Sequence, residues 1–145
     1  MKELRLLFFI LFIGLGISHA QTNKNYVIDL PSVNQGTTFE NVLHLLLSSD
    51  YFVLSADKDS GLIQCKIVKD NSKVFTKLEV DILEYNLLIR DNQDKGTRIY
   101  IQANLKQKIR NVEAKKYGVY IDDNGVTKEA KHYASLIEFL KSHLI

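Results

Sequence analysis

Alternation of apolar and polar residues dominates the middle of the chain and predicts antiparallel β-structure. Residues 97–110 place one apolar set on a single face, namely Ile99, Ile101, Ala103, Leu105 and Ile109, with polar side chains between them. Residues 73–90 form a second long run, and turn-forming residues 91–96 separate the two. Strands of about 13 residues exceed the usual length of about 5 or 6 and cannot stay flat in a small domain. We therefore expect one long hairpin that curves strongly.

The first long run breaks its own alternation, which predicts a β-bulge. Two in-step apolar sets differ in phase by one position, Leu78, Val80 and Ile82 against Tyr85, Leu87 and Ile89. A bulge at Leu83 and Glu84 opposite Asn104 restores inward pairing on both sides. The inward pairs are then Ile89 with Ile99, Leu87 with Ile101, Tyr85 with Ala103 and Ile82 with Leu105. The same register predicts two outward charge pairs, Asp81 with Lys106 and Glu79 with Lys108.

A shorter hairpin precedes the long one, over residues 51–68. Its two strands carry alternating sets that we expect to face inward, Phe52, Leu54 and Ala56 on the first and Ile63, Cys65 and Ile67 on the second. The reversal falls at residues 57–61, where Gly61 supplies the positive φ that a tight turn needs. Asp57 and Asp59 resemble the start of a calcium loop, but Leu62 and Val68 occupy the glycine and bidentate-acid positions of such a loop. Both aspartates are therefore interpreted as turn formers.

Two amphipathic helices are predicted, one before and one after the strands. Thr37 with Glu40 three residues later forms a capping box, so the first helix should begin directly after Thr37. Its buried stripe is Phe39, Val42, Leu43 and Leu46. Thr127 should cap the second helix, in which His132 falls near the polar side. The stripe of this helix is Tyr133, Leu136, Ile137, Leu140 and Leu144.

The remaining elements complete an α+β order. Residues 25–30 form a first strand that Pro31 ends, and residues 117–121 form a short strand. A turn follows at residues 122–125, where Asn124-Gly125 is the strongest local signal. We expect an antiparallel, strongly curved sheet with both helices packed on one face and a polar opposite face.

Residues 1–20 have the pattern of a secretory signal peptide. Two basic residues precede an apolar run at 6–17, and small residues at Ser18 and Ala20 are typical of a cleavage site. The run has about 12 residues, short of the roughly 20 that a membrane-spanning helix needs. We expect cleavage near Ala20 and an exported chain, periplasmic or secreted, with no transmembrane anchor; a retained interfacial anchor is the alternative. Residues 21–145 then form a single domain.

Charge and cysteine content exclude several classes of function. Residues 1–20 carry two cations and one anion, so the net charge falls from +2 to +1 on cleavage. A nearly balanced chain gives no support to nucleic-acid binding. Cys65 is the only cysteine, which excludes an intramolecular disulfide, and its step with Ile63 and Ile67 predicts a buried structural thiol. We expect no cofactor and no metal ion.

The predicted order resembles the TATA-binding-protein-like or helix-grip arrangement. The residues that carry the resemblance are the capped helix at 38–47, the strand at 51–56 and the turn Asp57-Lys58-Asp59-Ser60-Gly61-Leu62-Ile63. Small exported bacterial domains of unknown function share this succession, as do the repeat domains of the lipoprotein of outer-membrane β-barrel assembly. This chain has one such domain and no lipid-bearing cysteine after the apolar run. The resemblance implies the fold and a place in the cell envelope, and no chemistry.

Three functional hypotheses follow. The first is an exported, non-enzymatic interaction module that binds an envelope protein or a surface polymer through its outer sheet face, at Phe75, Leu83, Arg98 and Tyr100. The second is a carrier of a small apolar ligand, with a cavity lined by Ile99, Ile101, Tyr133 and Leu136. An enzyme ranks last, because its candidate residues share no local framework, namely Cys65, His44 and Asp57. The sequence leaves the partner and the oligomeric state open.

Overall fold

The computed structural model describes residues 26–70, 78–93, 95–111 and 118–145. The described residues form a six-stranded sheet and two helices. In chain order the elements are β1 (Tyr26–Leu30), α2 (Gln35–Leu47), β2 (Phe52–Asp57), β3 (Leu62–Asp70), β4 (Leu78–Asp91), β5 (Thr97–Asn111), β6 (Gly118–Val126) and α3 (Lys131–Leu144).

All strand pairings in the sheet are antiparallel. The strand order is β1-β5-β4-β3-β2, and β6 also pairs with β5. Because β4 occupies one edge of β5, the other edge is shared by β1, which pairs with residues 97–101, and β6, which pairs with residues 104–111. The predicted α+β class with an antiparallel sheet is confirmed.

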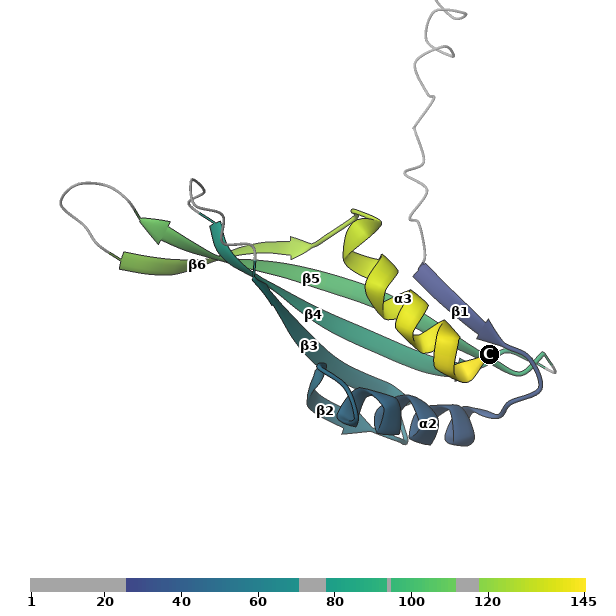
Figure 1. The fold of residues 1–145 in the computed structure, drawn as a ribbon. Coiled ribbons are helices and arrows are strands. Elements are labelled where there is room, and N and C mark those ends of the chain that lie inside the picture. Colours follow the sequence, from purple (N-terminus) through teal and green to yellow (C-terminus); the bar gives the residue numbers. More distant parts are fainter. Residues whose placement is uncertain (1–25, 71–77, 94, 112–117) are drawn as a thin grey trace, which may run out of the picture.

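Both helices pack on one face of the sheet, here called the inner face (Figure 1). Helix α2 contacts β2 and β4, and α3 contacts β1, β5 and α2. The core between them contains helix residues Phe39, Val42, Leu46, Tyr133, Leu136 and Leu140 and strand residues Ile28, Leu30, Ile63, Cys65, Leu83, Tyr85, Leu87, Ile89, Ile99, Ile101 and Ala103. These are the apolar stripes and alternating faces of the sequence, brought together into one layer.

The sheet is longer than the helices that cover it (Figure 1). We call the end of the sheet beyond Leu83 and Ala103 the sheet extension and define it as residues 67–70, 78–82, 105–111 and 118–123; Ile67 and Leu105, at its boundary, still pack against the core. The rest of β1, β3, β4 and β5 forms the covered half. In the extension, exposed apolar side chains include Val68, Val119, Tyr120 and Ile121.

The register of the long hairpin confirms one part of the prediction and corrects another. The predicted pairs Ile89 with Ile99, Leu87 with Ile101 and Tyr85 with Ala103 are present. The bulge at Leu83 and Glu84 is wrong, because pairing there is continuous, and the irregularity of β4 lies between Leu78 and Val80. The inward side chain is Leu83, which lies opposite Leu105, so Ile82 faces outward. Beyond Leu83 the inner face of β4 is not covered by a helix. The apolar residues Val80 and Ile82 can therefore lie on the outer face without a loss of core packing.

The shifted register also changes the charge pairs. Asp81 lies opposite Gln107, and Gln107 Nε2 donates to Asp81 Oδ1 at 2.8 Å. Lys106 instead binds Glu84, which is two positions along the neighbouring strand from its direct partner Ile82. Such diagonal pairs lie within reach of long side chains on one sheet face.

Both predicted helix caps are corrected. The N-cap of α2 is Asn34, whose Oδ1 accepts from the backbone N–H of Thr37 at 2.8 Å. Glu40, expected in a capping box, binds Lys58 of the β2–β3 turn at 2.7 Å instead. Helix α3 begins at Lys131 without a side-chain cap, four residues after Thr127. Asn34 satisfies the cap geometry one turn earlier, so the Thr-x-x-Glu pattern is not used.

Two strand predictions are also corrected. An irregularity between Val53 and Ser55 changes the phase of β2, so Val53 packs on the core while Phe52 and Leu54 are exposed. Ala56 is exposed as well, in an edge strand. Residues 122–125 do not form a connecting turn but belong to β6, where Gly125 has a φ of 69° beside a register shift. A glycine with positive φ is typical of a β-bulge. The Asn-Gly pair therefore forms a bulge here, although the same pair is also common in turns.

Candidate functional surfaces

An apolar band crosses the outer face of the sheet, which is the face opposite the helices. Its members are paired in register across four adjacent strands, in the order Val27, Tyr100, Leu88 and Leu62. Tyr100 is 40% exposed and the other three side chains are partly buried. Directly opposed side chains on one sheet face lie in contact distance of each other. The four therefore form one continuous surface, here called the outer band.

Charged residues border the outer band on one side. Arg98 donates to both carboxylate oxygens of Asp29, at 2.6 Å and 3.1 Å. This hydrogen bonding holds the pKa of Asp29 below its ordinary value. Arg90 lies opposite Arg98 on β4 and is exposed. Two guanidinium groups against one carboxylate give this border a net positive charge.

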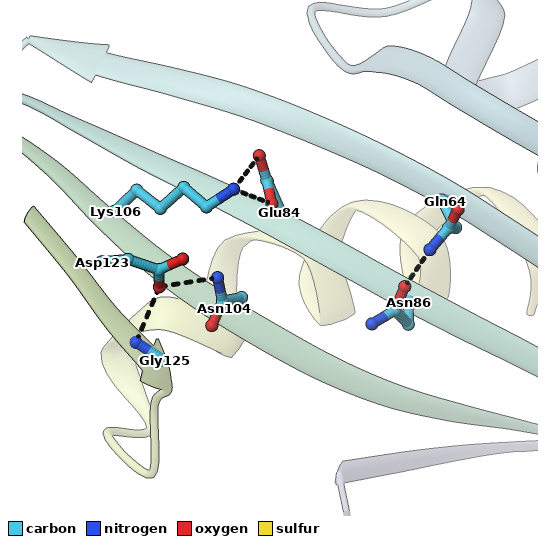
Figure 2. Close-up of polar contacts among 7 residues, drawn as sticks. All are labelled: Gln64, Glu84, Asn86, Asn104, Lys106, Asp123 and Gly125. Atoms are coloured by element: carbon cyan, nitrogen blue, oxygen red, sulfur yellow. Dashed lines mark hydrogen bonds and ion pairs between the residues drawn. The ribbon is translucent and has the colours of Figure 1, made fainter. Parts of the chain in front are cut away.

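Uncharged side chains border the outer band on the other side. Ser55 Oγ donates to Gln64 Oε1 at 2.8 Å, and Gln64 Nε2 donates to Asn86 Oδ1 at 2.8 Å (Figure 2). Asn86 Nδ2 then points to Gln102 Oε1 at 3.4 Å. The amides thus connect β2, β3, β4 and β5 in a single row. In this row the side-chain carbonyl oxygens of Gln64, Asn86 and Gln102 each accept one hydrogen bond.

Ion pairs and a β6 bulge continue the polar surface toward the extension (Figure 2). Lys106 Nζ lies 2.9 Å and 3.0 Å from the two carboxylate oxygens of Glu84. Asp123 Oδ1 accepts from the Gly125 backbone N–H at 2.9 Å and from Asn104 Nδ2 at 3.1 Å. These bonds, led by the backbone one, lower the pKa of Asp123. The polar part of the outer face therefore consists of side chains that are hydrogen-bonded or ion-paired across neighbouring strands.

The structure separates the four residues of the predicted interaction surface. Arg98 and Tyr100 lie on the outer face, in or beside the outer band. Leu83 is a wrong assignment, because it is 1% exposed and lies on the inner face. Leu83 is two positions from Tyr85 in a continuous strand and therefore shares its inner face. The sequence contains two apolar sets that differ by one position, so it did not show which set Leu83 joins. Phe75 lies outside the described residues.

A groove of about 740 Å³ opens on the inner face where α3 begins. It lies between the start of the helix, the β6–α3 connection and the inner face of the sheet. The described residues that line it are Lys69, Asp81, Leu83, Leu105, Gln107, Asn124, Thr127, Lys128, Glu129, Lys131 and His132. Nine of these eleven described residues are polar or charged, and the other two are leucines.

The β6–α3 connection forms a fixed wall of this groove. The Thr127 backbone N–H donates to Ala103 O at 3.0 Å, and its carbonyl accepts from Tyr133 Oη at 2.7 Å. Thr127 Oγ1 lies 2.8 Å from His132 Nδ1. Tyr85 Oη donates to the carbonyl of His132 at 2.6 Å. Four bonds from both backbone and side chains hold the wall against the core, and such support keeps a binding site in one geometry.

His132 is a residue whose place the sequence did not reveal. Helical phase put it near the polar side of α3, but it is only 7% exposed. It is covered because α3 begins next to the folded connection, which supplies Thr127 as its partner. The only sequence feature that could have indicated this contact is a threonine five residues before the histidine, and this spacing is too common to predict one.

The candidate cavity residues of the carrier hypothesis lie in the core, and the residues considered for an enzyme lie apart from one another. Ile99, Ile101, Tyr133 and Leu136 are all buried in the core cluster, and none of them lines the groove. Cys65 is buried, and burial raises the pKa of its thiol to about 12. Asp57 accepts hydrogen bonds from Ser60 and from the Asp59 N–H within its own turn. His44 is exposed on α2.

No group of three or more histidine, cysteine, aspartate or glutamate side chains is placed to hold a metal ion in the part of the chain that the structure describes. Within the same residues, neither helix has the length and apolar character required to cross a membrane.

No family model matches the chain, and no curated protein matches it. Among solved structures, it aligns with the crystal structure of a DUF4468 family protein from Bacteroides ovatus ATCC 8483, over 81% of this chain and 78% of that one. The identity is 8% and the TM-score is 0.37. At these values the likeness assigns the chain to no family.

Proposed function

We propose that this protein is an exported, non-enzymatic interaction module of the bacterial cell envelope that binds another envelope protein through the outer band. The observation that carries the proposal is the continuity of Val27, Tyr100, Leu88 and Leu62 across four strands. Single exposed apolar residues are ordinary on a protein surface. A contiguous apolar patch with a polar rim is typical of a binding site.

The composition of this surface favours a protein partner. An apolar centre with a polar rim is the usual anatomy of a protein interface, and tyrosine and arginine are enriched where binding energy concentrates. Tyr100 stands at the centre of the outer band, and Arg90 and Arg98 stand at its border. The fitting partner presents apolar side chains to the outer band and a carboxylate to Arg90.

Export and the finer fold assignment belong to the same proposal. Residues 1–20 support export through their basic start, short apolar run and small residues before the cleavage point. A helix-grip or TATA-binding-protein-like arrangement is supported by two helices on one face of a long antiparallel sheet. Export and the helix-grip arrangement are thus both part of the proposed function.

Affinity capture with matched tyrosine variants tests the proposal. The full chain, with a carboxy-terminal tag, is expressed in its native host, and the envelope fraction is captured as wild type, Tyr100→Ala or Tyr120→Ala. Tyr120 is the control, since it is also exposed but lies on the sheet extension. We expect one protein to be enriched with wild type and Tyr120→Ala and to bind at least about tenfold more weakly to Tyr100→Ala.

Several results would overturn the proposal. They are equal capture by Tyr100→Ala and wild type, recovery of polysaccharide without protein, recovery of only a second copy of this chain, or absence of enrichment. Mass measurement of the purified chain tests export separately. A chain that begins near Gln21 supports cleavage after Ala20, whereas an intact Met1 contradicts it.

A further inference from the structure

Strand β6 has an open edge and exposed apolar side chains. It pairs with β5 along one edge, and no other strand among the described residues pairs with it. All residues from 118 to 123 are exposed, including Val119, Tyr120 and Ile121 with exposed fractions of 51%, 52% and 61%. The backbone N–H and C=O groups along an open edge are a template for pairing with a further strand. The occupant that fits this edge is therefore a β-strand.

Two other described strands lie at edges of the sheet, and both carry features that hinder edge pairing. Strand β1 has five residues, and Pro31 follows it directly. Strand β2 contains an irregularity between Val53 and Ser55, and such bulges turn an edge away from a neighbour. The irregularity of β6 lies beside Gly125, so residues 118–123 pair with β5 in continuous register. This stretch contains neither proline nor lysine, which makes β6 the least protected of these edges.

The sequence of β6 is complementary to a second copy of itself. In an antiparallel pair about a twofold axis at Tyr120, this side chain faces its own counterpart, and Val119 faces Ile121. Each apolar residue then meets an apolar partner. Asp122 lies opposite Gly118, so no two carboxylates face each other. An axis at Ile121 would instead place Asp122 opposite Tyr120, and an axis at Asp122 would place two carboxylates together.

We propose that β6 pairs with β6 of a second copy of this chain, in antiparallel register about Tyr120, and that this contact forms a symmetric dimer. A twofold contact uses the same surface on both subunits, so one pairing covers both open edges and closes the assembly. The chain has a net charge of only +2, so long-range repulsion between two copies is weak. The contact lies on the sheet extension and leaves the outer band free, which makes it independent of the proposed function.

Analytical ultracentrifugation of the purified protein over a range of concentrations tests the dimer. We expect a monomer–dimer equilibrium, with monomers on dilution. Tyr120→Lys should weaken association at least about tenfold, because two ammonium groups then face each other at the axis. Val68→Lys is the matched control and should associate as wild type. It places the same charge at an exposed apolar position of β3, which β4 and β5 separate from β6.

Cysteine variants test the register. Tyr120→Cys should form a disulfide-linked dimer on mild oxidation, because the two thiols face each other at the axis. Val119→Cys should not crosslink with itself, since diagonal positions of an antiparallel pair lie about 7–8 Å apart. It should crosslink with Ile121→Cys when the two variants are mixed. Cys65 is buried and does not compete in these reactions.

Three results would overturn the proposal. They are a monomer at every concentration, association of Tyr120→Lys equal to that of wild type, and a loss in Val68→Lys as large as that in Tyr120→Lys. Crosslinking of Val119→Cys with itself as readily as Tyr120→Cys would also contradict it, because the axis would then lie elsewhere. Circular dichroism melts verify that each variant is folded.

Discussion

The covered half of the sheet and the sheet extension are built from the same long strands but differ in what lies above them. In the covered half, the inner side chains of β4 and β5 are almost completely buried beneath α2 and α3. In the extension, β6 exposes three consecutive apolar residues, Val119, Tyr120 and Ile121. The same antiparallel pairing thus supports a buried core at one end of the sheet and exposed apolar side chains at the other. The helices, rather than the alternation, determine where the core ends.

The two regions also obtain their order from different interactions. The covered half is held by apolar contacts and by buried bonds such as Tyr85 Oη to His132 O. The extension relies on strand pairing and on exposed polar contacts such as Asn104 to Asp123. Since exposed polar contacts contribute little to folding stability, the extension should depend on the covered half and not the reverse.

Truncation of one apolar side chain in each region gives the largest expected contrast. Leu136→Ala removes a side chain with no exposure and should lower the free energy of unfolding by roughly 2–5 kcal/mol. Ile121→Ala, at 61% exposure, should change it by less than about 0.5 kcal/mol. Urea unfolding measures both. A comparable loss from Ile121→Ala would show that the extension contributes a core of its own.

A pair of glycine substitutions gives the next contrast. Gly61 and Gly125 both have a φ near that of a left-handed residue, 61° and 69°, so alanine costs about 1–2 kcal/mol of strain at either. A Cβ on Gly61 would also clash with the carbonyl oxygen of Ile89, whereas nothing lies within 4 Å of one on Gly125. Gly61→Ala should therefore be the more destabilising in thermal melts. Equal losses would mean that the backbone at Ile89 moves without cost.

Removal of a buried hydroxyl should have a smaller effect of opposite sign. Thr38 is 1% exposed, and its Oγ1 is buried without a hydrogen-bond partner. Thr38→Val keeps the shape and removes the desolvated oxygen, which should raise the free energy of unfolding by about 1 kcal/mol. Urea unfolding against Thr37→Val, an exposed neighbour, checks this. A loss of stability in Thr38→Val would indicate that the hydroxyl has a partner in solution.

Titration of Asp123 should produce the smallest change, confined to the extension. Its folded pKa is below the model-peptide value of 3.8, so its contribution is complete above that pH and is lost as pH falls through the lower folded pKa. The Gly125 amide proton, which donates to Asp123, should follow this titration in nuclear magnetic resonance spectra. Asp123→Asn should abolish the transition, and core resonances should stay unchanged. A midpoint above 3.8 contradicts the assignment.

Sequence reasoning was most successful where local pattern and burial agree. The hairpin that turns through Gly61, the inward sets of the covered half and the stripes of both helices all follow from periodicity, because each of these faces is covered. The predicted faces were wrong where a pattern lacked a covering helix or a regular register. Val80 and Ile82 lie beyond the helices, and in β2 an irregularity between Val53 and Ser55 exchanges the two faces of the strand.

The candidate surfaces were predicted less completely than the fold. Arg98 and Tyr100 were placed on the outer face from alternation alone, whereas the continuity of the outer band required the register of four strands. The groove could not be foreseen, because it combines residues from β3, β4, β5, β6 and α3. No local spacing relates Asp81 to Gln107.

The sequence by itself determined the order of helices and strands, the apolar stripes of both helices, the inward set of β5 beneath the helices, and the burial of Cys65. These features depend on side-chain periodicity and on neighbours within a few residues. Only the tertiary structure decided that β1 and β6 share one edge of β5, that the helices stop short of the sheet end, and that His132 meets Thr127. The reason is physical: pairing partners and helix coverage depend on contacts between distant segments, and alternation along one strand carries no information about them.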